Sequence, residues 1–101
     1  MIPSKIDLHP VAVKEARAAY HWYLRRSAMA AARFRAAFEA ALKQIARTPN
    51  RWPIYLYGTR YRHLRRFPFV LVYRLRVDRL RVVAVAHTGR RPGYWKKRKF
   101  K

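Results

Sequence analysis

The sequence predicts an α+β fold in which an antiparallel helical hairpin packs on one face of a mainly antiparallel sheet. Three observations support this fold class. Apolar residues recur at helical spacing through residues 10–47. Runs rich in β-branched and aromatic residues, typical of strands, occupy most of residues 61–86. A short alternating run at residues 5–8 predicts one strand before the helices, so the expected order is β-α-α-β-β-β.

The first helix is expected at residues 10–26. Pro10 suits its first turn, where the missing N–H would have no partner, and Glu15 near its start matches the positive end of the helix dipole. Ser27 is a suitable cap for a second helix. That helix ends at Thr48-Pro49-Asn50, because proline disfavours helical backbone in the residue before it. The few residues between the helices require a hairpin.

The second half of the chain predicts a loop and three strands. Residues 49–59 combine two prolines and Gly58 with aromatic side chains, which indicates an ordered, packed loop. Strands follow at 61–67, 69–76 and 80–86, and their short connections make them an antiparallel meander. The third strand is almost entirely apolar, so we expect it to be central and covered on both faces.

With the helices on one face of the sheet, arginines from several strands are expected to line the other. Arg74 and Arg76 share one parity on their strand, and His63 and Arg65 share one on theirs. Together with Arg81 on the third strand, these residues predict a basic sheet face.

Length and composition indicate one domain, residues 1–95, followed by a basic tail, residues 96–101, with little to order it. The chain has no cysteine, and its four histidines and four carboxylates argue against an all-protein metal site. We expect no cofactor. No apolar run approaches the roughly 18 residues of a membrane span, and the N-terminus lacks the apolar region of a signal peptide. A cytosolic protein is therefore expected.

Charge is the strongest bulk signal. The chain carries 25 Lys and Arg against four Asp and Glu, a net charge of +21, and 16 of the basic residues lie in residues 51–101. Folding does not require such an excess, because self-repulsion destabilises the compact state. The composition favours a polyanionic or acidic protein partner, and a merely solvated arginine-rich surface is the alternative.

The segment from His87 to Trp95 is the main candidate site. It follows the apolar third strand, which holds the next residues in place while they remain open to solvent. Metal-free RNA cleavage needs a base, cations for the phosphorane and an acid. His87 or His63 are candidates for the base, Arg65, Arg90 and Arg91 for the cations, and Tyr94 for the stacking or proton-donating group. Alternatively, His87 caps the strand, the arginines are solvated or pair with a partner's carboxylates, and Tyr94-Trp95 close the core.

The order of these features resembles the RelE/ParE superfamily of type II toxin–antitoxin toxins, also labelled plasmid stabilisation proteins. The resemblance spans about Asp7 to Trp95. Its carriers are Trp22-Tyr23, Ala32 and Phe34 in the helices, the Pro49 and Pro53 loop, Arg65 to Arg74, Val82 to His87, and Arg90-Arg91-Pro92-Gly93-Tyr94-Trp95.

The resemblance implies a toxin that is neutralised by a co-expressed acidic antitoxin, which wraps an extended or helical segment over the basic surface. RelE-like members cleave messenger RNA in the ribosomal A site without metal, and ParE-like members poison DNA gyrase. Arg91 falls where RelE-like enzymes place an arginine on the scissile phosphate, and Tyr94 lies near their C-terminal tyrosine. Val70, however, stands where those enzymes carry a second arginine.

From this resemblance we expect growth inhibition by ribosome-dependent mRNA cleavage, with His87, Arg91 and Tyr94 as catalytic residues. Residues expected to bind phosphate or antitoxin are His63, Arg65, Arg74, Arg81 and Arg90. Two alternatives stay open at this point: a ParE-like toxin that poisons gyrase by protein binding, and a basic nucleic-acid-binding module without catalysis.

Overall fold

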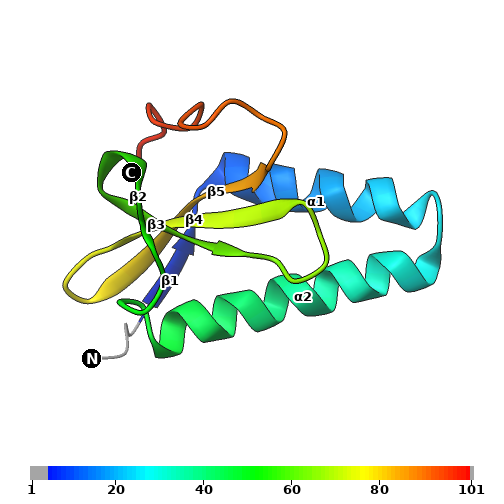
Figure 1. The fold of residues 1–101 in the computed structure, drawn as a ribbon, viewed down its shortest axis with the longest axis horizontal. Coiled ribbons are helices and arrows are strands. Elements are labelled where there is room, and N and C mark those ends of the chain that lie inside the picture. Colours follow the sequence, from blue (N-terminus) through cyan, green and yellow to red (C-terminus); the bar gives the residue numbers. More distant parts are fainter. Residues whose placement is uncertain (1–4, 101) are drawn as a thin grey trace.

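The computed structural model describes residues 5–100, in which two helices pack on a five-stranded mixed sheet (Figure 1). The predicted fold class is confirmed. The elements are β1 (Lys5–Leu8), α1 (Pro10–Leu24), α2 (Ala28–Arg47), β2 (Ile54–Tyr55), a 3-10 turn (Leu56–Gly58), β3 (Thr59–His63), β4 (Phe69–Leu75) and β5 (Arg79–His87). None of the helices within residues 5–100 is both long and apolar enough to cross a membrane.

The strands lie in the order β1-β5-β4-β3-β2. β3, β4 and β5 form the predicted antiparallel meander, and β1 adds to it in parallel beside β5. β5 is central, as predicted, and Val82 and Val83 are fully buried on its opposite faces. β1 pairs with β5 only as far as Leu8 and Val82, so the second half of β5 has no strand neighbour on that side.

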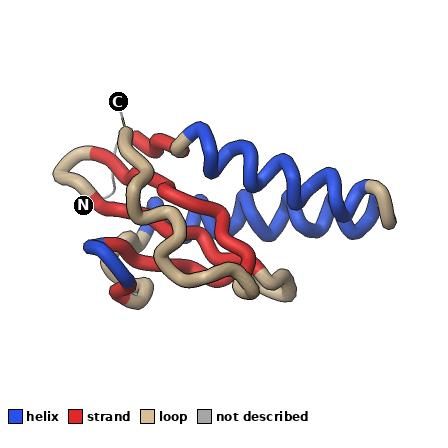
Figure 2. Tube along the Cα trace, turned by 90° about the horizontal axis from the view of Figure 1, so that it is seen from above, coloured by secondary structure: helices blue, strands red, loops and turns tan. Residues whose placement is uncertain are grey.

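Both helices begin where the sequence predicts. The Nδ1 of His9 accepts a hydrogen bond from the backbone N–H of Val11 at 3.1 Å, and Pro10 is the first helical residue. The Oγ of Ser27 accepts from the N–H of Ala30 at 3.2 Å, which caps α2. The two helices form the expected hairpin, whose tip projects beyond the sheet (Figures 1 and 2).

The structure corrects two of the predicted boundaries. The strand predicted at 61–67 ends at His63, because Leu64 turns into the core and Arg66 adopts the left-handed conformation, with φ of 70°. The loop predicted at 49–59 is ordered, but it also contains β2, a strand of only two residues that pairs with the start of β3.

The prediction that arginines line the sheet face opposite the helices holds only in part: Arg81 lies there, over the Phe100 ring, but apolar residues form most of that face. The chain after β5 crosses that face as a third layer (Figure 2). It places Trp95, which is 1% exposed, in a second apolar cluster with Val72, Val83, Ala84 and Ala86. β4 and β5 carry apolar residues on both faces, and these would otherwise face water.

The expectation that little orders residues 96–101 is also wrong for two of them. Arg98 forms a bidentate ion pair with Glu15 on α1. Phe100 packs its ring edge-on against His9, with ring centroids 5.4 Å apart, and contacts the second apolar cluster. The C-terminal segment, residues 88–100, is therefore held by both α1 and the sheet.

Candidate functional site

A cavity of about 480 Å³ lies beside the end of β5, beneath the C-terminal segment. The predicted catalytic residues His87, Arg91 and Tyr94 all line it, together with Arg90. Its remaining walls are largely apolar and aromatic, with contributions from β2, β3, β4 and Trp95. The structure therefore brings the predicted catalytic set together in one basic, aromatic-lined cavity.

His87 ends β5 and is exposed. Its Nδ1 accepts a hydrogen bond from the backbone N–H of Gly89 at 2.9 Å, and its ring packs edge-on against Phe69. In a neutral imidazole that accepts at Nδ1, the proton is on Nε2. His87 in this state caps the strand end and has a donor, not a base, at its free nitrogen.

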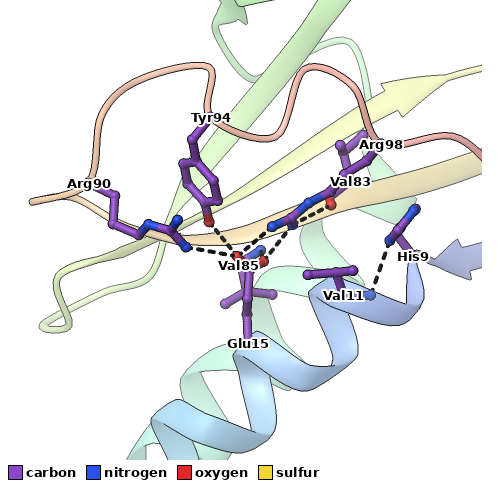
Figure 3. Close-up of polar contacts among 8 residues, drawn as sticks. All are labelled: His9, Val11, Glu15, Val83, Val85, Arg90, Tyr94 and Arg98. Carbon is purple, nitrogen blue, oxygen red and sulfur yellow. Dashed lines mark hydrogen bonds and ion pairs between the residues drawn. The ribbon is translucent and has the colours of Figure 1, made fainter.

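Tyr94 and Arg98 converge on Glu15, a single carboxylate on α1 (Figure 3). The Tyr94 hydroxyl donates to Oε2 of Glu15 at 2.5 Å. Arg98 donates to both carboxylate oxygens, at 2.8 and 2.9 Å, and its Nη1 also donates to the carbonyl of Val83 at 3.1 Å. The backbone N–H of Val85 donates to Oε1 at 3.0 Å. Glu15 and Arg98 therefore supply hydrogen-bond partners for backbone groups of β5 beyond the point where β1 ends.

The Glu15 network favours the ionised form of Glu15 and the protonated form of Tyr94. Burial alone would raise the pKa of Glu15, but the hydrogen bonds from Arg98, Tyr94 and Val85 outweigh it and lower the pKa from its ordinary value of 4.5. Burial, reinforced by the hydrogen bond to the Glu15 carboxylate and by its charge, raises the pKa of Tyr94 to about 12. The Tyr94 hydroxyl therefore keeps its proton and donates it in a hydrogen bond to Glu15.

The two arginines of the cavity differ in what they contact. The Arg90 guanidinium lies 3.6 Å from the centre of the Tyr94 ring, and its Nη1 is 3.6 Å from Oε2 of Glu15. Arg91 is exposed, and within residues 5–100 its guanidinium has no hydrogen bond or ion pair. Of the predicted cations at this site, Arg91 is the one available to an incoming anion.

Three of the other predicted binding residues lie on the sheet away from this cavity. Arg74 and Arg81 are directly opposite one another on β4 and β5. Arg74 donates to the carbonyl of Tyr57 at 3.4 Å, and Arg81 lies over the Phe100 ring at 5.0 Å. Arg81 lies six positions before His87 on β5, about 20 Å along the strand. His63 ends β3 and does not line the cavity.

Arg65 lies in the β3–β4 hairpin and faces a different groove, beside α2. It therefore does not share a surface with His63, as the strand predicted at 61–67 required. Among residues 5–100, no group of three His, Cys, Asp or Glu side chains is placed to hold a metal ion.

Glu15 and Arg98 are the site residues that sequence reasoning missed. We had assigned Glu15 only to the helix dipole, but it does not lie in the first turn of α1. The available signal was its spacing, since Ala12 and Ala19, one turn away on either side, are both buried. A lone carboxylate on the buried face of a helix needs a cationic partner, and Arg98 supplies it.

Comparisons with known proteins identify one family and one similar fold. A family model described as the ParE toxin of the type II toxin–antitoxin system parDE matches residues 6–92. A solved structure of the chromosomal ParDE toxin–antitoxin system from P. aeruginosa is similar in fold, with a TM-score of 0.63 and 17% identity over 85% of this chain and 96% of the other. A search of the curated proteins found no match.

Proposed function

Because the chain belongs to the ParE toxin family of type II toxin–antitoxin systems, we propose that it stops growth by binding DNA gyrase and trapping the enzyme on cleaved DNA. As a toxin of the type II parDE family, the protein has an antitoxin as its partner. Messenger RNA cleavage, expected from the sequence, is the competing mechanism.

The observation that carries the proposal is the state of Tyr94. Its hydroxyl is bound to Glu15, its pKa is about 12, and Arg90 covers its ring. A general acid works best with a pKa near the operating pH, and a base stacks best on an uncovered ring. The placement of Tyr94 therefore favours neither general-acid catalysis nor base stacking. It favours a structural role, in which Tyr94 holds the C-terminal segment against α1.

Two further residues support protein binding over RNA cleavage. The Nδ1 of His87 accepts a hydrogen bond from Gly89, and in that arrangement its other ring nitrogen carries the proton and is a donor. Val70 is part of the apolar wall of the cavity, where RelE-like enzymes carry an arginine. Arg91 alone does not provide the acid and the base that metal-free cleavage requires.

The molecular surface offers the anchors that protein binding requires. At the hairpin tip, Trp22, Leu24 and Met29 are 45%, 42% and 63% exposed, and tryptophan and methionine are typical interface residues. The Arg26 guanidinium lies 3.4 Å from the centre of the Trp22 ring, which holds that ring in place. With a net charge of +21, the complementary antitoxin is acidic.

Purified toxin added to DNA gyrase and supercoiled plasmid tests the proposal directly. We expect linear DNA to accumulate after detergent and protease treatment, and addition of the antitoxin to abolish it. Plasmid that stays supercoiled or relaxed at every toxin concentration would contradict gyrase poisoning. In that case, codon-linked cleavage of a translated messenger, lost in Arg91→Ala, would favour the RNA mechanism.

A further inference from the structure

A second surface, lined by different residues from the cavity at His87, carries a concentration of positive charge. A groove of about 750 Å³ runs between α2 and the β3–β4 hairpin. Its charged lining consists of Arg33 from α2, Arg62 from β3, and Arg65 and Arg66 from the hairpin. We call these four residues and the groove they line the basic groove.

The arginines of the basic groove have no acidic partner within residues 5–100. Within residues 5–100, the guanidinium groups of Arg33, Arg65 and Arg66 form no hydrogen bond or ion pair. Arg62 is held by a neutral group, since its Nε and Nη2 both donate to Oε1 of Gln44, at 3.0 and 2.8 Å. Four cations thus gather without a counter-charge, which self-repulsion disfavours unless an anion binds.

Backbone geometry does not explain the presence of Arg66. Its φ of 70° lies in the left-handed region, where glycine or asparagine fits better than a long side chain. An arginine at this turn adds charge to the groove at some cost in backbone strain. Its side chain, and not its backbone, is therefore the feature that needs an explanation.

None of the carboxylate side chains of the chain lies in the basic groove. All four pair with an arginine elsewhere: Asp7 and Asp78 with Arg79, Glu15 with Arg98, and Glu39 with Arg35. Within residues 5–100, therefore, no carboxylate neutralises the basic groove.

The groove floor favours a phosphate backbone over a protein chain. Alanines of α2 form most of it, and among its lining residues Phe67 is the single large apolar side chain, so the groove itself supplies few apolar anchors to a protein partner. The exposed large apolar side chains of the chain lie elsewhere, among them Met29 at the hairpin tip and Ile54 in β2. An arginine guanidinium can donate two parallel hydrogen bonds to the oxygens of one phosphate. The small alanine side chains of the floor let a nucleic-acid backbone approach these guanidinium groups closely.

We propose that the basic groove binds the phosphate backbone of a nucleic acid, without reading its sequence. The lining of α2 from Ala30 to Gln44 extends about 21 Å along the helix, which corresponds to about six base pairs of duplex. Backbone contacts of this kind fix position on a nucleic acid and carry no sequence information. The inference does not depend on gyrase being the target.

Fluorescence anisotropy with a labelled 20-base-pair DNA duplex, and with an RNA duplex of the same length, tests the inference over a range of salt concentrations. The test variant is Arg33→Gln/Arg65→Gln/Arg66→Gln. The matched control, Arg17→Gln/Arg25→Gln/Lys97→Gln, removes the same charge from three exposed residues outside the groove. Both variants carry the same net charge, so a general attraction to polyanions affects them equally.

In the test variant, the slope of log K against log salt should become shallower by about 2 to 3, since each phosphate contact contributes about 0.9. Its affinity near 0.1 M salt should fall at least about tenfold below that of the control. The single variant Arg65→Gln should give about one third of the slope change, which keeps the test valid if the triple variant folds poorly. Loss with one duplex only would show which nucleic acid the groove prefers.

Equal affinity and equal slope in the two triple variants would overturn the proposal, because the chain's overall charge would then explain binding. A 20-residue polyglutamate peptide serves as the competing ligand. If the test variant loses affinity for the peptide but not for either duplex, the groove binds an acidic protein segment, and the nucleic-acid inference is wrong.

Discussion

Tyr94 donates a hydrogen bond to Glu15, which lies 79 residues earlier in the chain. This contact and the Arg98 ion pair fasten the C-terminal segment to α1 and complete the edge of β5. Tyr94, which was predicted to be catalytic, therefore links the C-terminal segment to α1, and we expect its replacement to affect stability more than toxicity.

Tyr94→Phe should lower the free energy of unfolding by about 2 kcal/mol, the usual worth of a hydrogen bond to a charged group. The ring stays under Arg90, so the fold should persist. Urea denaturation measures the first effect and colony formation after induction the second, where toxicity should remain within a few-fold of wild type. A folded Tyr94→Phe protein without toxicity would restore the catalytic role of the hydroxyl.

Glu15→Gln should lower the free energy of unfolding at pH 7 by about 3 kcal/mol, because Arg98 then loses its counter-charge in a half-buried site. The folded-state pKa of Glu15 lies below 4.5, so the ionised form is the stabilising one. Its contribution is complete above the unfolded pKa and is lost as the pH falls through the folded value. The difference between wild type and variant should therefore be constant above about pH 6 and shrink below pH 4.5.

Glu39→Gln is the matched control for this experiment. Its ion pair with Arg35 spans 3.8 Å between side chains that are 56% and 67% exposed, and such pairs contribute less than about 1 kcal/mol. A difference for Glu15→Gln that equals the one for Glu39→Gln, or that does not change with pH, would contradict the role assigned to Glu15.

Arg98→Met should destabilise the protein, while Lys97→Met should not. The Arg98 side chain is 14% exposed and bound to Glu15, so its loss leaves a half-buried carboxylate without its main partner, at a cost of about 3 kcal/mol. Lys97 is exposed, and an exposed substitution usually costs less than about 0.5 kcal/mol. Thermal melts of the two variants, recorded in parallel, test whether the tail is ordered.

Gly93→Ala and Gly58→Ala separate steric conflict from backbone strain. Both glycines have positive φ, 82° and 71°. An added Cβ at Gly93 would lie 2.8 Å from Cε2 of Tyr57, whereas at Gly58 nothing lies within 4 Å. Gly58→Ala should cost about 1 kcal/mol of unfolding free energy from strain alone, and Gly93→Ala should cost more and shift the Tyr57 ring. Equal costs in urea denaturation would show that Tyr57 moves away freely.

The helices and the meander could be predicted because their signals are local. Ser27 caps α2, and the apolar run of β5 marks a central strand. β2 was missed because two residues, Ile54 and Tyr55, carry no periodicity. The end of β3 was misplaced because the run has no turn residue before Pro68, whereas the backbone already turns into the hairpin at Leu64.

The third layer was missed for a different reason. The charge of residues 96–101 indicates a solvated tail, yet Arg98 is held by a carboxylate from the opposite end of the chain. Patterns within one sequence do not reveal which residues pair when they lie 83 positions apart, as Glu15 and Arg98 do. The clustering of His87, Arg91 and Tyr94 was correctly anticipated because a short segment carries all three. The hydrogen bond from Tyr94 to Glu15 was not anticipated, because its acceptor lies on α1, far from Tyr94 in the sequence.

The most direct test of gyrase poisoning follows DNA and messenger RNA in the same cells after toxin induction. We expect gyrase to be recovered covalently bound to DNA within minutes, while primer extension on translated messengers shows no new codon-linked ends, in wild type and in His87→Ala alike. Codon-linked cleavage that disappears in His87→Ala, with no gyrase trapped on DNA, would contradict the account.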